Sequence, residues 1–212
     1  MYIMTPPRVI LVSLNSALEH LRRADPVMER LISAVGPYSI RYHEPTFRAL
    51  ARSIVFQQLN GTAAARIFER LEKACGEVDP SHVLKLRMPT LRKVGLSERK
   101  AEYIRDLARH TRDGSVDFTL LLDLPDEEIL ERLTAVRGIG EWTVHMFLIF
   151  ALRRPDVLPV GDYGVRTAMK HQYGLAELPK PKEMARIAEP WRPWASVASW
   201  YLWRSLDSPA EL

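Results

Sequence analysis

The chain has 212 residues, of which 47% are hydrophobic and 26% charged, so it has the composition of a globular protein long enough to bury a substantial core. Its formal net charge of +4 fits a polyanionic partner without indicating one, and its single cysteine, Cys75, excludes an intramolecular disulfide and any site built from four cysteines. The lone cysteine predicts a reducing cytoplasm, and no stretch has the layout of a signal peptide or the ~20 apolar residues of a membrane span.

Apolar residues recur at helical spacing through the first third of the chain. The segment from Asn15 to Val35 predicts one helix, or two short helices divided near Asp25 and Pro26. Two more helices are expected in PTFRALARSIVFQQL, which starts at Pro45, and in TAAARIFERLEKAC. Because no strong alternating run of β-branched residues appears, the sequence predicts an all-α fold.

The middle of the chain carries mixed charge. VLKLRMPTLRKVGLSERKAEYIRDLARHTRDG predicts two helices joined near Gly95, with Ser97 as the N-cap of a helix from Glu98 to Arg109. Basic residues in this segment alternate with acidic ones. The pattern therefore leaves two interpretations open, a surface that meets a polyanion and an ordinary solvated face.

A glycine turn separates two helices farther along the chain. Apolar side chains from Ile129 to Val136 keep the helical period, so the first helix should run to about Val136. Gly138 and Gly140 supply a turn that tolerates positive φ, and the following apolar residues, from Trp142 onward, predict a largely buried second helix. We expect this helix-hairpin-helix unit to span about residues 127–152.

The turn offers backbone N–H groups to a ligand. The unpaired N–H groups at the start of the second helix carry a partial positive charge, and the missing Cβ atoms of Gly138 and Gly140 would let a phosphodiester approach closely. The alternative is a tight helix connection with a glycine C-cap, which is the commoner meaning of an isolated G-x-G.

Two motifs together resemble a known superfamily. Val136 to Thr143 (VRGIGEWT) and Leu158 to Arg166 (LPVGDYGVR) are similar to the helix-hairpin-helix DNA glycosylases, and most similar to the 3-methyladenine DNA glycosylase II, or AlkA-type, branch. The likeness runs from about Pro45 to Trp203. It implies a two-lobed helical fold with an active-site cleft between the lobes, one lobe from 45–154 and the other from 1–44 plus 155–212. It also implies a compact form without the β-rich N-terminal domain of larger members.

The resemblance assigns chemistry to Asp162. On the sequence alone this aspartate is more often a cap for the helix that begins at Tyr163. In the superfamily, the aspartate after the Pro-containing loop is catalytic, and the two roles are compatible. A carboxylate facing an extruded nucleotide stabilises positive charge on the sugar and orients or deprotonates the attacking water.

The resemblance also places a wedge that fills the hole left by the extruded nucleotide. It falls in SIVFQQLNGTAAAR (53–66), where Gln58 or Leu59 would enter the duplex. The other interpretation is a polar helix end whose glutamines pair with backbone groups.

Aromatic residues are the candidates for a base pocket. Indole faces of Trp142 and Trp200 suit a base made cationic by alkylation, and the resemblance adds Met146 and Phe47. The remaining tryptophans of the C-terminal segment, Trp191, Trp194 and Trp203, are interpreted as core. Trp142 occupies the position at which bifunctional members carry a Schiff-base lysine, so the resemblance implies hydrolysis without strand cleavage.

The hairpin itself would contact the DNA backbone. The residues implied are Gly138, Ile139, Gly140 and Thr143. No cofactor is expected to be required, but the resemblance implies a structural Na⁺ or K⁺ held by hairpin carbonyls, here those of Thr134, Val136 and Gly138.

These observations favour a monofunctional glycosylase that removes alkylated bases, of the 3-methyladenine and 7-methylguanine type, from DNA. The expected partner is double-stranded DNA with damaged bases, and the expected state is a cytoplasmic monomer, associated with the nucleoid in a bacterium. Two alternatives stay open. One is a glycosylase for oxidised or deaminated purines, and the other is a non-catalytic helix-hairpin-helix module that binds DNA.

Overall fold

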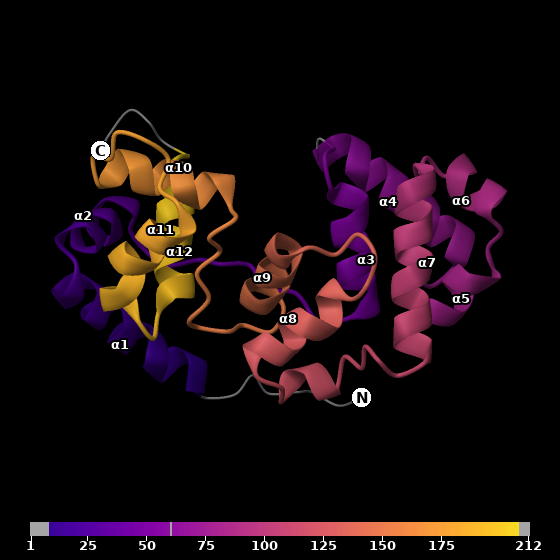
Figure 1. The fold of residues 1–212 in the computed structure, drawn as a ribbon, viewed down its shortest axis with the longest axis horizontal. Coiled ribbons are helices and arrows are strands. Elements are labelled where there is room, and N and C mark those ends of the chain that lie inside the picture. Colours follow the sequence, from indigo (N-terminus) through magenta and orange to yellow (C-terminus); the bar gives the residue numbers. More distant parts are fainter. Residues whose placement is uncertain (1–8, 60, 208–212) are drawn as a thin grey trace. The chain divides into compact units, whose positions relative to one another are not determined.

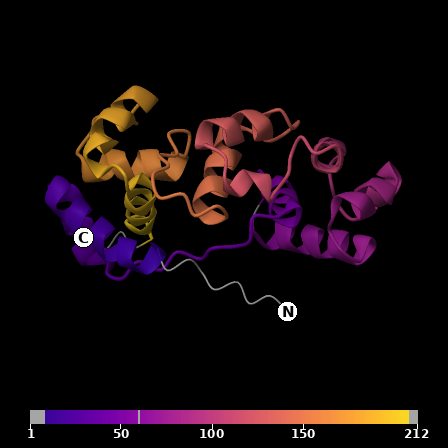
Figure 2. The same cartoon turned by 90° about the horizontal axis from the view of Figure 1, so that it is seen from below.

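A computed structural model describes residues 9–59 and 61–207, and it is helical throughout this part of the chain, with no strand (Figures 1 and 2). The all-α prediction is confirmed. The chain forms two compact units, which we name by their place in the sequence: the central unit, Tyr42–Arg153, and the terminal unit, Met1–Arg41 with Arg154–Leu212. The boundaries expected from the resemblance lie close to these.

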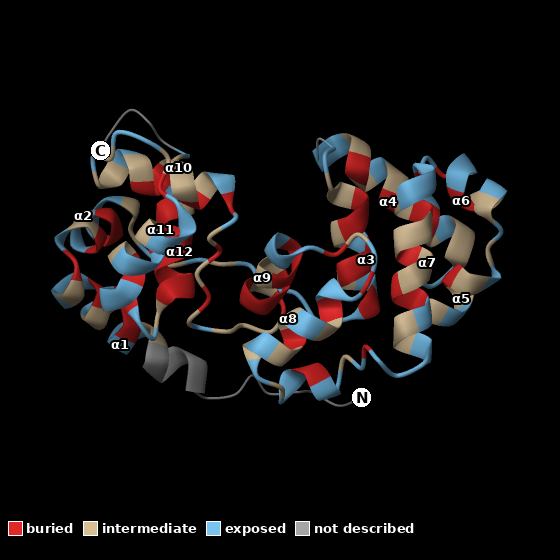
Figure 3. Ribbon diagram, in the orientation of Figure 1, coloured by how far each residue is buried: buried red, intermediate tan, exposed pale blue. Residues whose placement is uncertain are grey.

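The terminal unit joins the beginning and the end of the chain. α12 packs against α2 and α10, and α1 packs against α2. Eight of the residues of α12 are buried, which makes it the most enclosed helix of this unit (Figure 3). The helices of this unit are α1 (Val9–Ala24), α2 (Pro26–Val35), α10 (Tyr163–Gln172), α11 (Pro181–Ala188), η2 (Glu189–Trp191) and α12 (Ala195–Arg204).

Asp25 is a buried polar centre of this unit. Its Oδ1 accepts a hydrogen bond of 2.8 Å from the backbone N–H of Val27 and so caps α2. Its Oδ2 accepts hydrogen bonds from the hydroxyl of Tyr173 and from the indole Nε1 of Trp191, at 2.8 Å for the indole. Burial and the bond to Asp25 raise the pKa of Tyr173, which therefore stays neutral. The predicted division near Asp25 and Pro26 is confirmed, because this aspartate ends one helix and starts the next.

The central unit is built around α7. This helix packs against α3, α5 and α6, while α8 packs against α9 and α3 against α4. Figure 3 shows buried residues on the inner side of these helices and exposed residues on the outer side. The helices are α3 (Phe47–Phe56), α4 (Gly61–Cys75), α5 (Pro80–Lys85), α6 (Met88–Lys93), α7 (Glu98–Arg112), η1 (Leu120–Leu122), α8 (Asp126–Thr134) and α9 (Glu141–Phe150).

Three helix boundaries differ from the prediction. The segment expected to hold two helices holds three, because Pro89 fits only the first turn of a helix and so starts α6. α3 ends at Phe56, which leaves the glutamines outside it. α8 ends at Thr134, although Val136 is still buried. The predicted cap is confirmed, since the Ser97 hydroxyl accepts from Lys100 N–H at the start of α7.

Within the described residues, none of the helices combines the length and the apolar character that a membrane span needs.

Candidate functional site

Asp162 lies at the N-terminus of α10 and is 8% exposed. The turn before it is tight, because Asp162 N–H donates to the Pro159 carbonyl at 2.9 Å. Its Oδ1 accepts hydrogen bonds of 2.8 Å from the backbone N–H of Val165 and of 2.8 Å from the indole Nε1 of Trp203. The capping role expected of Asp162 is confirmed, and the carboxylate is oriented by two donors on one oxygen.

Trp203 is the residue that the sequence analysis missed. It is half-buried against the core, as expected, but its indole N–H also orients Asp162. Gly164 makes room for this contact, because a Cβ there would lie 3.1 Å from both Asp162 Oδ1 and Trp203 Cδ1. The signal in the sequence was the spacing of Trp200 and Trp203, three residues apart on one helix, which places both on the same side of α12.

Trp200 lies in an aromatic cluster of the terminal unit. Its ring is edge-on to Tyr38, with centroids 4.7 Å apart, and edge-on to Tyr201, with centroids 4.9 Å apart. Trp200 is 6% exposed, while Tyr38 is only partly buried. The guanidinium of Arg204 lies 5.9 Å from the centre of the Trp200 ring. Trp191 is fully buried and Trp194 packs against the core, in agreement with their interpretation as core residues.

The two hairpin glycines have different reasons to be glycine. Gly138 has a φ of +85°, and a Cβ on it would lie 2.1 Å from Cδ2 of the Tyr103 ring. Gly140 is extended, with φ −100° and ψ 169°, and a Cβ there would meet nothing within 4 Å. The internal packing of the protein therefore requires a glycine at 138 but does not require one at 140.

The hairpin leads into α9 without a side-chain cap. Its N-cap is Gly140, which has no side chain that could accept a hydrogen bond from the first turn of the helix. Ile139 and Thr143 are each 4% exposed, so their side chains are buried. The hairpin therefore enters α9 through a glycine N-cap that leaves open space beside the start of the helix.

The pocket candidates of the central unit differ in exposure. Trp142 was expected to be part of a largely buried helix, but it is 45% exposed because it lies in the first turn of α9, beyond the packed part of the helix. Met146 is partly buried, and Phe47, in the first turn of α3, is 5% exposed.

The candidate wedge lies in the turn after α3. Gln58 has a φ of 55°, which is the left-handed region that non-glycine residues seldom occupy, and Leu59 is 40% exposed. The side chain of Gln57 points back into the protein, where its Nε2 donates to the Gly138 carbonyl at 2.9 Å. The structure therefore brings the turn and the hairpin together within the central unit, while it pairs Asp162 with Trp203 within the terminal unit.

A model of the HhH-GPD superfamily of base excision DNA repair proteins matches residues 51–193. The chain belongs to this superfamily. The matched range includes the turn after α3, the hairpin and Asp162.

Individual members of the superfamily match most of the chain. DNA-3-methyladenine glycosylase 1 of Schizosaccharomyces pombe is 33% identical over 204 residues, which cover 92% of this chain and 89% of the relative. A solved structure of the S. pombe 3-methyladenine DNA glycosylase in complex with abasic DNA has a TM-score of 0.80 at 32% identity, and covers 92% of this chain and 98% of that one. The crystal structure of a DNA-3-methyladenine glycosidase from Bacillus halodurans has a TM-score of 0.82 at 35% identity, with 89% and 88% covered.

The sequence predicts a monovalent cation on three carbonyls of the hairpin. Carbonyl oxygens are suitable ligands for a hard cation. The Val136 carbonyl accepts from Ile139 N–H at 3.1 Å and the Gly138 carbonyl accepts from Gln57, so each uses one of its two lone pairs inside the protein. A cation on the carbonyls of Thr134, Val136 and Gly138 stays a prediction, with which the free lone pairs of Val136 and Gly138 are compatible.

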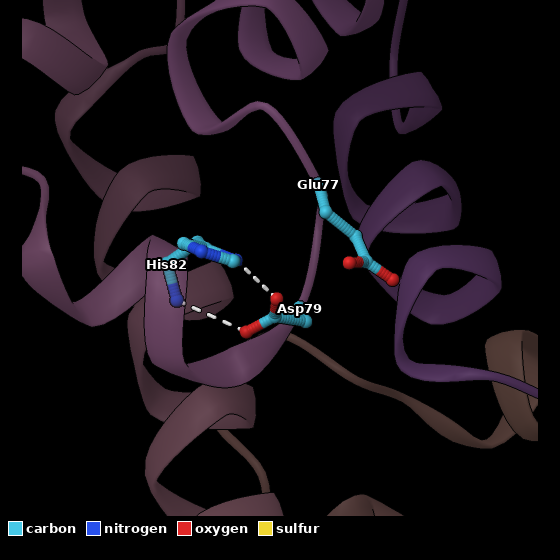
Figure 4. A group of neighbouring side chains, drawn as sticks. All are labelled: Glu77, Asp79 and His82. Atoms are coloured by element: carbon cyan, nitrogen blue, oxygen red, sulfur yellow. Dashed lines mark hydrogen bonds and ion pairs between the residues drawn. The ribbon is translucent and has the colours of Figure 1, made fainter.

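One further group has the composition of a metal site. Ligand atoms of Glu77, Asp79 and His82 all lie within 4.8 Å of one another (Figure 4). Asp79 already accepts from the backbone N–H of Ser81 at 2.7 Å and of His82 at 3.0 Å, and it also contacts the His82 ring. Burial raises the pKa of Asp79, but these hydrogen bonds outweigh it and lower the pKa to about 2. The contacts of the Asp79 carboxylate are therefore explained by its role as the N-cap of α5.

We expect His145 to make the stability of the central unit depend on pH. Its ring lies in α9, its Nδ1 has no hydrogen-bond partner within the described part of the chain, and burial lowers its pKa although Glu141 and Asp126 oppose the shift. Because the folded pKa lies below the unfolded value of ~6.5, the stabilisation is complete above that value and is lost as the pH falls below it. Chemical unfolding from about pH 7.5 to about pH 5 should show a decline in the free energy of unfolding that is smaller in His145→Gln. An equal decline in both proteins would assign it to other groups.

Proposed function

We propose that this protein is a monofunctional DNA glycosylase that hydrolyses the N-glycosidic bond of alkylated bases, of the 3-methyladenine and 7-methylguanine type, in double-stranded DNA. The observation that carries the proposal is the Asp162 carboxylate, 8% exposed and oriented by hydrogen bonds from Val165 N–H and Trp203 Nε1. The relatives named for the removal of 3-methyladenine support the choice of substrate. We also propose that the protein is a cytoplasmic monomer, associated with the nucleoid in a bacterium.

The reaction that we propose breaks the bond between the sugar C1′ and the base nitrogen. The electron pair of that bond passes to the alkylated base, which leaves as a neutral molecule because alkylation had made it cationic. Positive charge develops on the sugar, and the carboxylate of Asp162 stabilises it. Water then adds to C1′ and gives up a proton, with Asp162 orienting the water or accepting that proton, and the product is an abasic site.

The absence of an amine nucleophile supports hydrolysis. At position 142, where bifunctional members of the superfamily have the lysine that attacks the sugar, this chain has a tryptophan. An indole cannot form a Schiff base, so the strand should not be nicked. Indole and phenol rings of the terminal unit, such as Trp200 with Tyr38, suit a cationic base through cation–π attraction worth ~0.5–2 kcal/mol, which aids recognition but cannot supply the rate.

Two features of the hairpin support binding of the DNA backbone. The N-cap of α9 is a glycine without a capping side chain, and the space beside Gly140 is open, since a Cβ there would meet nothing within 4 Å. We propose that a phosphodiester occupies this space, against the backbone of Gly138, Ile139, Gly140 and Thr143. A Na⁺ or K⁺ on the carbonyls of Thr134, Val136 and Gly138 would add positive charge beside the phosphate.

The test is to incubate the purified protein with methylated duplex DNA and to separate the released bases by chromatography. Release of 3-methyladenine or 7-methylguanine without strand breaks is the expected result. Preference for an oxidised or deaminated purine in a panel of lesion duplexes would overturn the choice of substrate. DNA binding without release of any base would favour a non-catalytic binding module instead.

A further inference from the structure

The turn after α3 is held from two sides. Lys100, in the first turn of α7, donates from Nζ to the carbonyl of Val55 at 2.7 Å and to the carbonyl of Gln57 at 2.6 Å. Gln57 in turn donates from its side chain to the Gly138 carbonyl of the hairpin at 2.9 Å. One ammonium and one amide therefore connect α7, the turn and the hairpin.

The hydrogen bond from Lys100 to the Gln57 carbonyl does more than satisfy the end of α3, because it also fixes a peptide plane of the turn. It belongs to the peptide group that joins Gln57 to Gln58, and Gln58 has the unfavourable φ of 55°. By fixing this peptide plane, Lys100 fixes the backbone from which Gln58 and the exposed Leu59 project. Backbone strain of this kind persists only where surrounding contacts enforce it.

The environment of Lys100 strengthens these hydrogen bonds. Partial burial lowers the pKa of Lys100, so some water has been removed from around the ammonium. Hydrogen bonds from a charged donor are about twice as strong as neutral ones. Both acceptors are at the C-terminal end of α3, where the helix dipole favours a cation.

We propose that Lys100 is a positioning residue that holds the turn of Gln57, Gln58 and Leu59 in the shape needed to enter a duplex and replace an extruded base. This inference rests on the proposed function. We therefore expect Lys100 to increase the rate of base release when a paired base must be displaced. When the base is already unpaired, Lys100 should have little effect on that rate.

The experiment compares wild type with Lys100→Met on one alkylated base in two settings, a fully paired duplex and a single strand. Loss of the charged hydrogen bonds should lower single-turnover release from the duplex by about tenfold or more, while release from the single strand changes by less than about twofold. Lys100→Arg, which keeps the charge and the donors, should recover a large part of the loss. Fluorescence of 2-aminopurine next to an abasic site in a duplex should fall in the methionine variant, because the neighbouring bases are less unstacked.

Lys93→Met is the matched control, because Lys93 is exposed on the neighbouring α6 and loses the same charge. Its effect should be small and equal on both substrates. An equal loss on both substrates in Lys100→Met, or no loss at all, would overturn the inference. If the wild type released no base, the proposed function would fail, and the 2-aminopurine signal with abasic duplex would still decide the role of Lys100.

Discussion

Asp162→Asn should reduce the release of alkylated bases by about 10²–10³-fold, because the variant loses the negative charge that stabilises the sugar cation. The structure makes asparagine the informative substitution. Its carbonyl oxygen can still accept from Val165 N–H and from Trp203 Nε1, so the cap of α10 and the position of the side chain should persist. Single-turnover base release from methylated duplex DNA measures the effect, and affinity for abasic DNA should change little.

Asp156→Asn is the matched control for this experiment. Asp156 is an aspartate of the same unit that accepts from the Arg192 guanidinium at 2.7 Å and from Ala195 N–H at 3.2 Å, and it has no proposed part in the reaction. Its variant should release bases at the wild-type rate. If Asp162→Asn retained wild-type activity while folding normally, the mechanism would be wrong even though the superfamily is established.

The sequence predicted best where local chemistry decides the structure. The caps at Ser97 and Asp162 were foreseen, because a short polar side chain before an apolar period is a local signal, and the division near Asp25 and Pro26 was foreseen from the proline. The end of α3 was placed too late, because the apolar period runs on toward the glutamines while the contacts that stop the helix come from Lys100 and the hairpin. Those contacts join residues far apart in the sequence.

The candidate site shows the same limit. Asp162 was found from its motif, but the indole that orients it was assigned to the core, since a tryptophan at helical spacing carries no mark of a hydrogen bond 41 positions away. Trp142 was expected to be largely buried, because the apolar run of α9 contains it, yet it lies in the turn where packing begins. Local patterns fix which helix a residue joins, whereas its partners depend on packing.

Gly138 and Gly140 look equivalent in the sequence, and the structure predicts opposite effects for their replacement. Gly138→Ala should lower the free energy of unfolding by roughly 2–4 kcal/mol, since it combines a positive φ with a Cβ inside the Tyr103 ring. Gly140→Ala should change stability by less than about 1 kcal/mol, because its backbone is extended and its surroundings are open. Chemical unfolding of the two variants measures both effects.

For the affinity of the folded protein for DNA, we expect an effect at Gly140, the position with the smaller effect on stability. Under conditions in which it is fully folded, Gly140→Ala should still bind abasic duplex at least about tenfold more weakly, because the new Cβ occupies the space proposed for a phosphodiester. Gly114→Ala, compared under the same folding conditions, is the control, since a Cβ there also meets nothing within 4 Å and the position follows α7, outside the hairpin and the turn after α3. Wild-type affinity in Gly140→Ala would place the phosphate elsewhere, and Gly140 would then have no role that either packing or the ligand explains.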